Sequence, residues 1–144
     1  MGISTAASEK NLLNATSIRD FLEKNRENML DMKLSDYLSL LLSEKDLRVA
    51  DVIRDSGLGK SYVHQIFNGE KNPSRDKLIA IAFGLHLTAD ETQRMLKLGG
   101  CSELFARVAR DAVILFAINH GKKIDEAERL LYDNGFPTLY AQDR

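Results

Sequence analysis

A group of polar side chains between residues 60 and 68 is the most informative feature of this sequence. The group consists of Lys60, Ser61, His64, Gln65 and Asn68. Their ammonium, hydroxyl, imidazole and amide groups can hydrogen-bond to the edges of nucleic-acid bases or to phosphate oxygens. In an α-helix, positions with these spacings lie on one face.

The apolar residues of the same stretch predict the element that carries these side chains. Val63, Ile66 and Phe67 are spaced i, i+3 and i+4, so they share the opposite face of a helix. Gly57 stands where an earlier short helix must stop and turn, a task suited to a residue that tolerates positive φ. Residues 48–73 therefore predict two short helices joined by a glycine turn, the helix-turn-helix layout.

The segment 48–87, RVADVIRDSGLGKSYVHQIFNGEKNPSRDKLIAIAFGLHL, resembles the DNA-binding domain of the phage-repressor and Cro-like (Xre) family of bacterial regulators. The resemblance covers about residues 34–87 and implies an all-α, lambda-repressor-like domain of five helices. The matching residues are Gly57 in the turn, Val63 and Ile66 facing inward, Asn68-Gly69 after the second helix, Pro73-Ser74 before the next, and the stripe Leu78, Ile79, Ala82 and Leu85.

The resemblance also implies roles for the polar side chains. In this family the second helix enters the major groove, while the first crosses the DNA backbone. Base contacts would then come from Lys60, Ser61 and Gln65, with His64 beside them. Glutamine can pair with adenine and lysine with guanine, each worth about 1–3 kcal/mol of discrimination. The alternative for each of these residues is a solvated surface side chain.

Phosphate contacts set the register of a protein on DNA and carry no sequence information directly. The candidates for these contacts are Arg48, Tyr62, Asn68, Lys71 and Arg75. Arg48 stands where phage repressors often place a polar residue that holds phosphate at the start of the first motif helix. The neighbouring Val49 has no group that could do so.

Two features depart from the family pattern. The position of Ile53 is commonly a small alanine, because the two motif helices approach closely there, so a larger side chain suggests altered spacing. The formal net charge is −1, whereas nucleic-acid binders usually carry a basic patch. The local charge is more favourable for phosphate contacts, because residues 60–77 contain four lysines or arginines and two acidic residues, a net charge of +2.

The flanking residues predict further helices. The stripe Leu34, Leu38, Leu41 and Leu42 indicates a helix over about 34–47. Ser74 is the expected N-cap of a helix over about 75–87. Thr88 and Glu91 form a capping box for a helix that ends at Gly99 and Gly100. Upstream of the domain, residues 1–15 are expected to be loosely ordered, and Thr16 or Ser17 would cap an extra helix carrying Ile18, Phe21 and Leu22.

Residues 100–144 predict a two-helix extension. The stretch 102–119 is expected to form one long helix, whose middle is apolar on every face and must be covered all round. Its own chain or a second subunit could provide that cover. A last helix over about 124–134 would end at Gly135, and Leu139 and Tyr140 would fold back as a tail. The chain thus divides into 1–33, 34–99 and 100–144.

Other functional classes find little support in the sequence. The chain is 44% hydrophobic and 28% charged, with no secretory leader and no apolar run long enough to span a membrane, so a cytoplasmic protein is expected. The single Cys101 excludes an internal disulfide framework, and the three histidines lack metal-ligand spacing. We expect no metal, no cofactor and, without a phosphate loop or nucleophile elbow, no enzyme.

Two functional hypotheses remain. The first is a sequence-specific transcriptional regulator, in particular a repressor, that binds double-stranded DNA as a homodimer with half-sites about one helical turn (~34 Å) apart. The second is a helix-turn-helix fold used as a protein–protein interaction or adaptor module with weakened DNA binding. The near-neutral charge, Ile53 and the apolar helix expected over 102–119 favour the adaptor. The polar face of residues 60–68 favours the regulator. A regulatory protein partner is compatible with both hypotheses.

Overall fold

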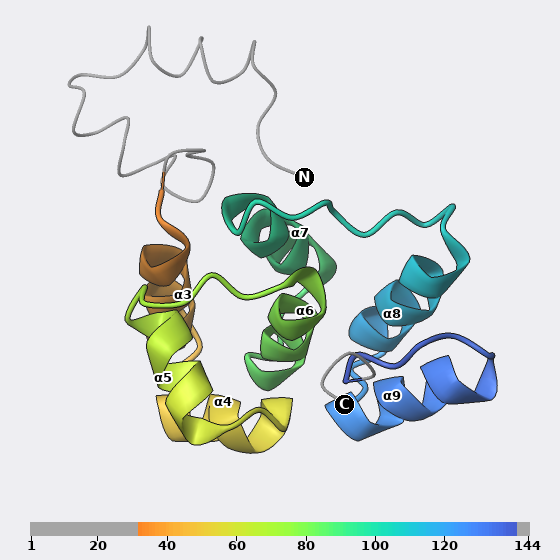
Figure 1. The fold of residues 1–144 in the computed structure, drawn as a ribbon, viewed down its shortest axis with the longest axis horizontal. Helices are drawn as coiled ribbons and strands as arrows, with labels where there is room; N and C mark the ends of the chain where they lie inside the picture. The colour runs from red at the N-terminus through yellow and green to blue at the C-terminus, as the bar shows by residue number, and fades with distance from the viewer. Residues whose placement is uncertain (1–31, 141–144) are drawn as a thin grey trace, which may run out of the picture. The chain divides into compact units, whose positions relative to one another are not determined.

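The computed structural model describes residues 32–140, and the helix expected after Thr16 or Ser17 lies outside the described residues. The described helices belong to one compact unit, residues 33–144. Within residues 32–140 the structure is all-helical (Figure 1). The helices are α3 (Leu34–Glu44), α4 (Val49–Ser56), α5 (Lys60–Phe67), α6 (Arg75–Gly84), α7 (Ala89–Leu98), α8 (Ala109–Asn119) and α9 (Ile124–Asp133).

Helices α3 to α7 follow the predicted order, and side-chain caps explain where α6 and α7 begin. The hydroxyl of Ser74 accepts the backbone N–H of Lys77 at 3.4 Å, and Thr88 and Glu91 exchange the two hydrogen bonds of a capping box at 3.2 and 2.9 Å. α3 and α6 each end three residues before the predicted limit. The chain turns there through a left-handed residue, Asp46 or His86, each with φ of 54°.

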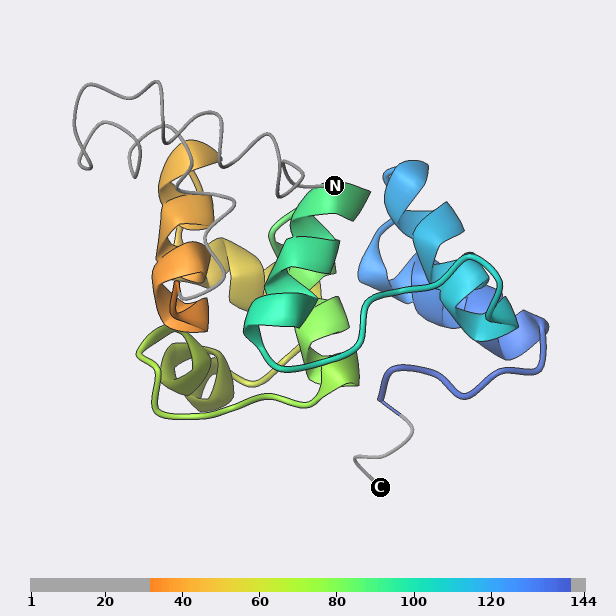
Figure 2. The same ribbon diagram turned by 90° about the horizontal axis from the view of Figure 1, so that it is seen from above.

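The central element is α6, whose residues from Leu78 to Gly84 are all buried. A helix that is apolar all round must be surrounded by other elements. α6 packs against α4, α7 and α9. In Figures 1 and 2 it lies in the middle of the unit, with α3 and α4 on one side and α8 and α9 on the other. The two-helix motif and the C-terminal extension are therefore built on one shared helix.

Helices α4 and α6 approach each other closely where Gly84 faces Val52 and Ser56. A methyl group added at Gly84 would lie 2.9 Å from the carbonyl oxygen of Val52 and 3.0 Å from the Cβ of Ser56. Ile53, in contrast, is only half-buried on α4. The small residue that lets α4 approach its neighbour is thus Gly84, and the large side chain of Ile53 points partly to solvent.

The prediction of one long helix over residues 102–119 is wrong, because α8 begins only at Ala109. In the preceding segment, Leu104 is buried, and the side-chain amide of Gln93 bonds both its N–H and its carbonyl oxygen at 2.7 Å. The N–H of Phe105 donates to Asp111 at 3.0 Å. Side chains thus form the hydrogen bonds to backbone N–H and carbonyl groups that would otherwise form within a helix.

Residues of the described chain cover α8 on one side. Ile114 and Ala117 are fully buried, whereas Phe116 is 48% exposed. The expectation that the apolar middle of this helix is covered all round is therefore not met by residues 32–140. Residues outside that range or a second subunit would have to cover the exposed side.

The last helix and the tail follow the prediction. α9 ends at Asp133, and Gly135 has φ of 78°. The chain then folds back, so that Leu139 is buried and its N–H donates to the carboxylate of Glu128 at 2.6 Å. No helix within residues 32–140 combines the length and apolar character needed to cross a membrane.

We predict that Gly84→Ala destabilises the protein. The added methyl gains about 1 kcal/mol of helix propensity but must push the backbone of α4 away, an overpacking cost of about 1–3 kcal/mol for a rigid neighbour. Chemical denaturation should therefore show a lower free energy of unfolding. Gly59→Ala is the control, because a Cβ there meets nothing within 4 Å. Equal stability of the two variants would contradict the close α4–α6 contact.

Candidate nucleic-acid interface

The turn between α4 and α5 positions the candidate site. Gly57 has φ of 74°, and its N–H donates to the carbonyl oxygen of Ile53 at 3.3 Å, which closes the end of α4. Leu58 is buried in the turn, and α5 begins at Lys60. This agrees with the predicted helix, glycine turn and second helix.

The inner face of α5 is the predicted one. Val63 and Ile66 are fully buried, Phe67 is 8% exposed, and the helix packs against α3 and α4. Asn68 and Gly69, with φ of 78° at the glycine, end the helix as expected. α5 therefore has a fixed orientation, with its apolar face towards the core.

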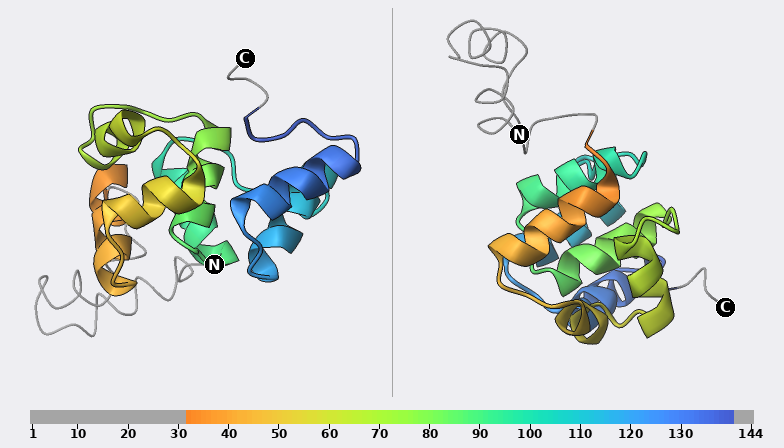
Figure 3. Two further views of the ribbon diagram at one scale, coloured as in Figure 1. Left: turned by 90° about the horizontal axis from the view of Figure 1, so that it is seen from below. Right: turned by 90° about the vertical axis from the view of Figure 1, so that its left-hand side faces the viewer.

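The outer face of α5 carries the predicted polar side chains. Lys60, Ser61, His64 and Asn68 are exposed, and Gln65 is half-buried beside them. Figure 3 shows α5 at the edge of the unit. We call these five residues the polar face of α5. The structure brings together all four predicted base-contacting residues on this face.

Apart from Arg75, the candidate phosphate contacts come from the start of α4, from α5 and from the loop after α5. Arg48 is exposed at the start of α4, where its backbone N–H donates to the carboxylate of Asp51 at 2.9 Å. This hydrogen bond lowers the pKa of Asp51, so the helix start keeps a negative charge beside the Arg48 side chain. Lys71 is exposed in the loop after α5, and Tyr62 is half-buried on the flank of α5.

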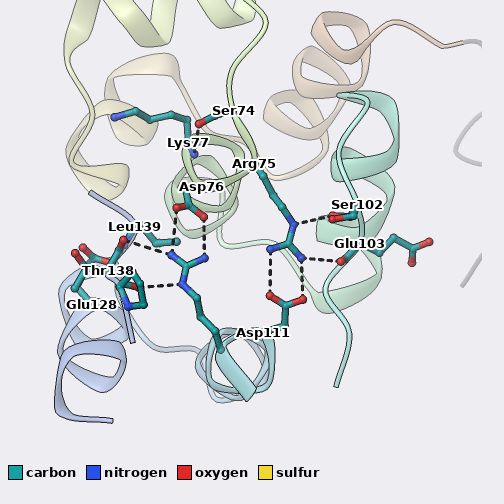
Figure 4. Close-up of polar contacts among 12 residues, drawn as sticks. Ser74, Arg75, Asp76, Lys77, Ser102, Glu103, Asp111, Glu128, Thr138 and Leu139 are labelled. Atoms are coloured by element: carbon teal, nitrogen blue, oxygen red, sulfur yellow. Dashed lines mark hydrogen bonds and ion pairs between the residues drawn. The ribbon is translucent and has the colours of Figure 1, made fainter. Parts of the chain in front are cut away.

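Arg75 differs from the expectation that it contacts phosphate. Its guanidinium makes two hydrogen bonds to the carboxylate of Asp111, at 2.8 and 3.1 Å, and donates to the carbonyl oxygens of Ser102 and Glu103 at 2.9 and 2.7 Å (Figure 4). Four of its five N–H donors are thus used within the chain. Arg75 holds the 102–111 segment, and we leave it out of the proposed phosphate contacts.

A second ion pair lies beside the first. The guanidinium of Arg110 bonds the Asp76 carboxylate at 3.0 and 3.2 Å, and also the carbonyl oxygens of Pro137 and Thr138 at 2.9 and 3.4 Å. The starts of α6 and α8 are therefore joined by two ion pairs. The arginine of the first comes from α6, and the arginine of the second comes from α8. Arg110 also fixes the C-terminal tail.

The environment of Asp111 stabilises its charge. Burial by itself would raise the pKa of this carboxyl, but the hydrogen bonds from Arg75 and from the Phe105 N–H, with the charges of Arg75 and Arg110, outweigh burial and lower the pKa. The carboxylate is only 5% exposed, so loss of its charge would leave Arg75 without its main partner.

The ion pairs do not change the local charge balance. Each pair joins one residue of the 60–77 segment to one of α8, so Arg75 and Asp76 are both neutralised. Lys60, Lys71 and Lys77 then remain against Glu70, and the segment keeps a net charge of +2. This positive charge lies next to the polar face of α5, as phosphate attraction requires.

Sequence reasoning missed the role of Tyr140, which contacts the turn before α5. Its hydroxyl donates to the backbone carbonyl oxygen of Ser56, although the two residues are 84 positions apart. The fold-back of the tail was predicted, but periodicity and spacing carry no signal for the partner of a residue this distant. Ser56 was missed for the same reason, since a buried serine at the end of an amphipathic helix has no distinctive pattern.

Other chemistry finds no support in the part of the chain that the structure describes. No group of three or more His, Cys, Asp or Glu residues within 32–140 is placed to hold a metal ion. Cys101 is half-buried, and burial raises the pKa of its thiol, which lowers its reactivity at neutral pH.

Comparisons of the chain with protein-family models, with curated proteins and with solved structures found no match. Assignment of function therefore depends on the geometry of α4, α5 and the residues around them.

We predict that Asp111→Asn lowers the free energy of unfolding at pH 7 by on the order of 3 kcal/mol, because it leaves a largely buried guanidinium without its counter-charge. The folded-state pKa of Asp111 lies below the unfolded value of about 3.9. Its contribution is therefore complete above that value and is lost as the pH falls through the folded pKa. The difference in free energy of unfolding between wild type and variant should therefore become smaller below about pH 4.

Thermal denaturation between pH 7 and pH 3 measures this effect. Asp133→Asn is the matched control, since Asp133 forms an exposed pair with Arg129 on α9 and should change stability by less than about 1 kcal/mol. If Asp111→Asn is no more destabilising than this control, the ion pair does not hold the extension.

Proposed function

We propose that this protein is a sequence-specific DNA-binding transcriptional regulator of the phage-repressor (Xre) type, with α3 to α7 as a lambda-repressor-like domain. In this proposal α5 is the recognition helix that enters the major groove, and α4 crosses the DNA backbone. One observation supports the proposal above the others: α5 buries three apolar side chains and presents a polar face at the edge of the unit.

Each part of this arrangement has a physical role in the proposal. Lys60, Ser61, His64 and Gln65 read base edges, because they have donors and acceptors on the side of α5 away from the core. Arg48, Tyr62, Asn68 and Lys71 set the register through phosphates. The glycine turn fixes the angle between α4 and α5, so the two sets of contacts can form together.

The small positive charge around α5 limits the affinity for DNA that we expect. Few cations surround the polar face of α5, so few counterions are released from DNA and non-specific affinity is modest. A second copy doubles the number of phosphate and base contacts. We therefore propose a homodimer that acts as a repressor at paired half-sites.

Exposed apolar side chains of the extension support self-association. Phe105, Val108 and Phe116 are 53%, 48% and 48% exposed, and they come from the start of the extension and from α8. Large apolar side chains on an accessible surface favour a protein interface. The same observation favours the second candidate function, an adaptor module that binds another protein. DNA binding distinguishes the two candidates.

We predict that Lys60→Ala weakens binding to a preferred site by about 5- to 150-fold, equivalent to about 1–3 kcal/mol, and has a smaller effect on mixed-sequence DNA. Lys71→Ala should weaken binding to the preferred site and to mixed-sequence DNA by a similar factor. It should also reduce the slope of log affinity against log salt by about 1. The preferred site is first selected from a random duplex pool, and affinities are then measured at several salt concentrations.

Arg129→Ala serves as the control, because Arg129 is an exposed cation on α9, away from α5. If all three variants bind as the wild type does, the site assignment is wrong. Absence of salt-dependent DNA binding by the wild type would instead favour the adaptor.

We predict that Phe116→Asp weakens the homodimer at least tenfold in sedimentation experiments. Its ring is half-exposed, so the charge disrupts an interface at little cost to the fold, and the helical circular dichroism should be retained. The fully buried Ile114 would be a poorer choice, because a charge there would unfold α8. Asn119→Asp, at an exposed polar position of the same helix, is the control. An unchanged dimer, or a monomeric wild type, would refute this interface.

A further inference from the structure

Tyr140 closes the end of α4 from outside the motif. Its hydroxyl donates to the carbonyl oxygen of Ser56, the last residue of α4, whose carbonyl has no partner within the helix. The approach requires a glycine at the next position, because a Cβ on Gly57 would lie 2.9 Å from the Tyr140 hydroxyl oxygen. Gly57 thus provides both the left-handed turn and the space for Tyr140.

Ser56 connects this contact to the turn itself. The residue is fully buried, and its side-chain oxygen accepts the N–H of Leu58 at 3.2 Å. Leu58 is the buried residue of the turn, two positions before α5 begins. A shift of the Ser56 backbone would therefore also move Leu58 and the turn that sets the position of α5.

The ring of Tyr140 makes a second connection to α5. The ammonium of Lys77 lies 5.6 Å from the centre of the Tyr140 ring and 5.8 Å from the centre of the Tyr62 ring. Cation–π contacts of this length are attractive. Lys77 therefore lies against one tyrosine of the tail and one of the recognition helix.

The tail that carries Tyr140 is itself anchored. Arg110 bonds the carbonyl oxygens of Pro137 and Thr138, and Leu139 is buried with its N–H on Glu128. Arg110 is in turn paired with Asp76 on α6. The extension can thus act on the turn as a fixed support, because its last described residues are tied to α6, α8 and α9.

We propose that Tyr140 is a positioning residue for the recognition helix, and that the C-terminal extension orients α5 for base reading through the Ser56 carbonyl and the Lys77–Tyr62 contact. This inference depends on the proposed function for its effect on DNA. The tail supports α5 and does not block it, because Lys60, Ser61 and His64 remain exposed while Tyr140 is in place. A pre-oriented helix loses less freedom on binding, which increases affinity.

The test compares Tyr140→Ala, which removes ring and hydroxyl, with Tyr140→Phe, which removes the hydroxyl alone. Tyr132→Ala is the matched control, because Tyr132 is a 74% exposed tyrosine on α9. At a temperature where every variant is folded, we expect Tyr140→Ala to weaken binding to the preferred duplex about tenfold and Tyr140→Phe about threefold, through lost pre-organisation. Tyr132→Ala should bind as the wild type does.

Amide hydrogen exchange of the full chain separates positioning from general stability. In Tyr140→Ala, exchange should accelerate at Leu58, whose N–H donates to the Ser56 hydroxyl, and at Val63, whose N–H donates to the carbonyl oxygen of Gly59. The acceleration there should exceed that in the core of α8, such as at Ala117. A uniform acceleration, or none, overturns the proposal, as does a Tyr140→Ala variant that binds DNA as tightly as the wild type or more tightly. If the wild type binds no DNA, the proposed function fails, while the exchange pattern still decides whether Tyr140 holds the turn.

Discussion

The rest of the structure depends on the burial of α6 among other helices. Its residues from Leu78 to Gly84 are buried on every side, so the helix is stable only where other helices exclude water from it. α4 reaches it through the small surface of Gly84, and α7 and α9 cover other sides. Because α4 is fixed in this way, the glycine turn and α5 extend from a rigid base, and the polar face of α5 has one orientation relative to the core.

The two ion pairs between α6 and α8 add orientation to this packing. Arg75 and Asp76 are consecutive at the start of α6, and Arg110 and Asp111 are consecutive near the start of α8. The observed pairing joins Arg75 to Asp111 and Asp76 to Arg110. The exchanged pairing would place like charges together, so this charge pattern disfavours the exchanged arrangement of α6 and α8. Both aspartates also lie in the first turn of their helices, where a negative charge is favoured.

The sequence was sufficient to predict structure where the causes are local. The α4–α5 pair, the Ser74 cap and the Thr88–Glu91 box depend on residues a few positions apart, and each was found. The helix predicted over 102–108 does not form, because side chains of other helices, Gln93 of α7 and Asp111 of α8, bond the backbone of this segment. The pairing of Arg75 with Asp111, 36 positions away, has no local signal either. Tyr140 and Ser56 show the limit most clearly, since nothing in either local pattern identifies its partner.

These long-range contacts bear on how a nearly neutral chain could bind DNA. The segment around α5 carries a net charge of only +2, with or without the paired Arg75 and Asp76, so long-range attraction would supply little of the binding free energy. Recognition would then depend on short-range contacts, and these require the side chains of α5 to be held close to their bound positions. On the proposed function, a fixed helix would compensate for a weak electrostatic field. Supports such as Ser56 and Tyr140 would then matter because affinity is sensitive to how firmly α5 is held when charge contributes little.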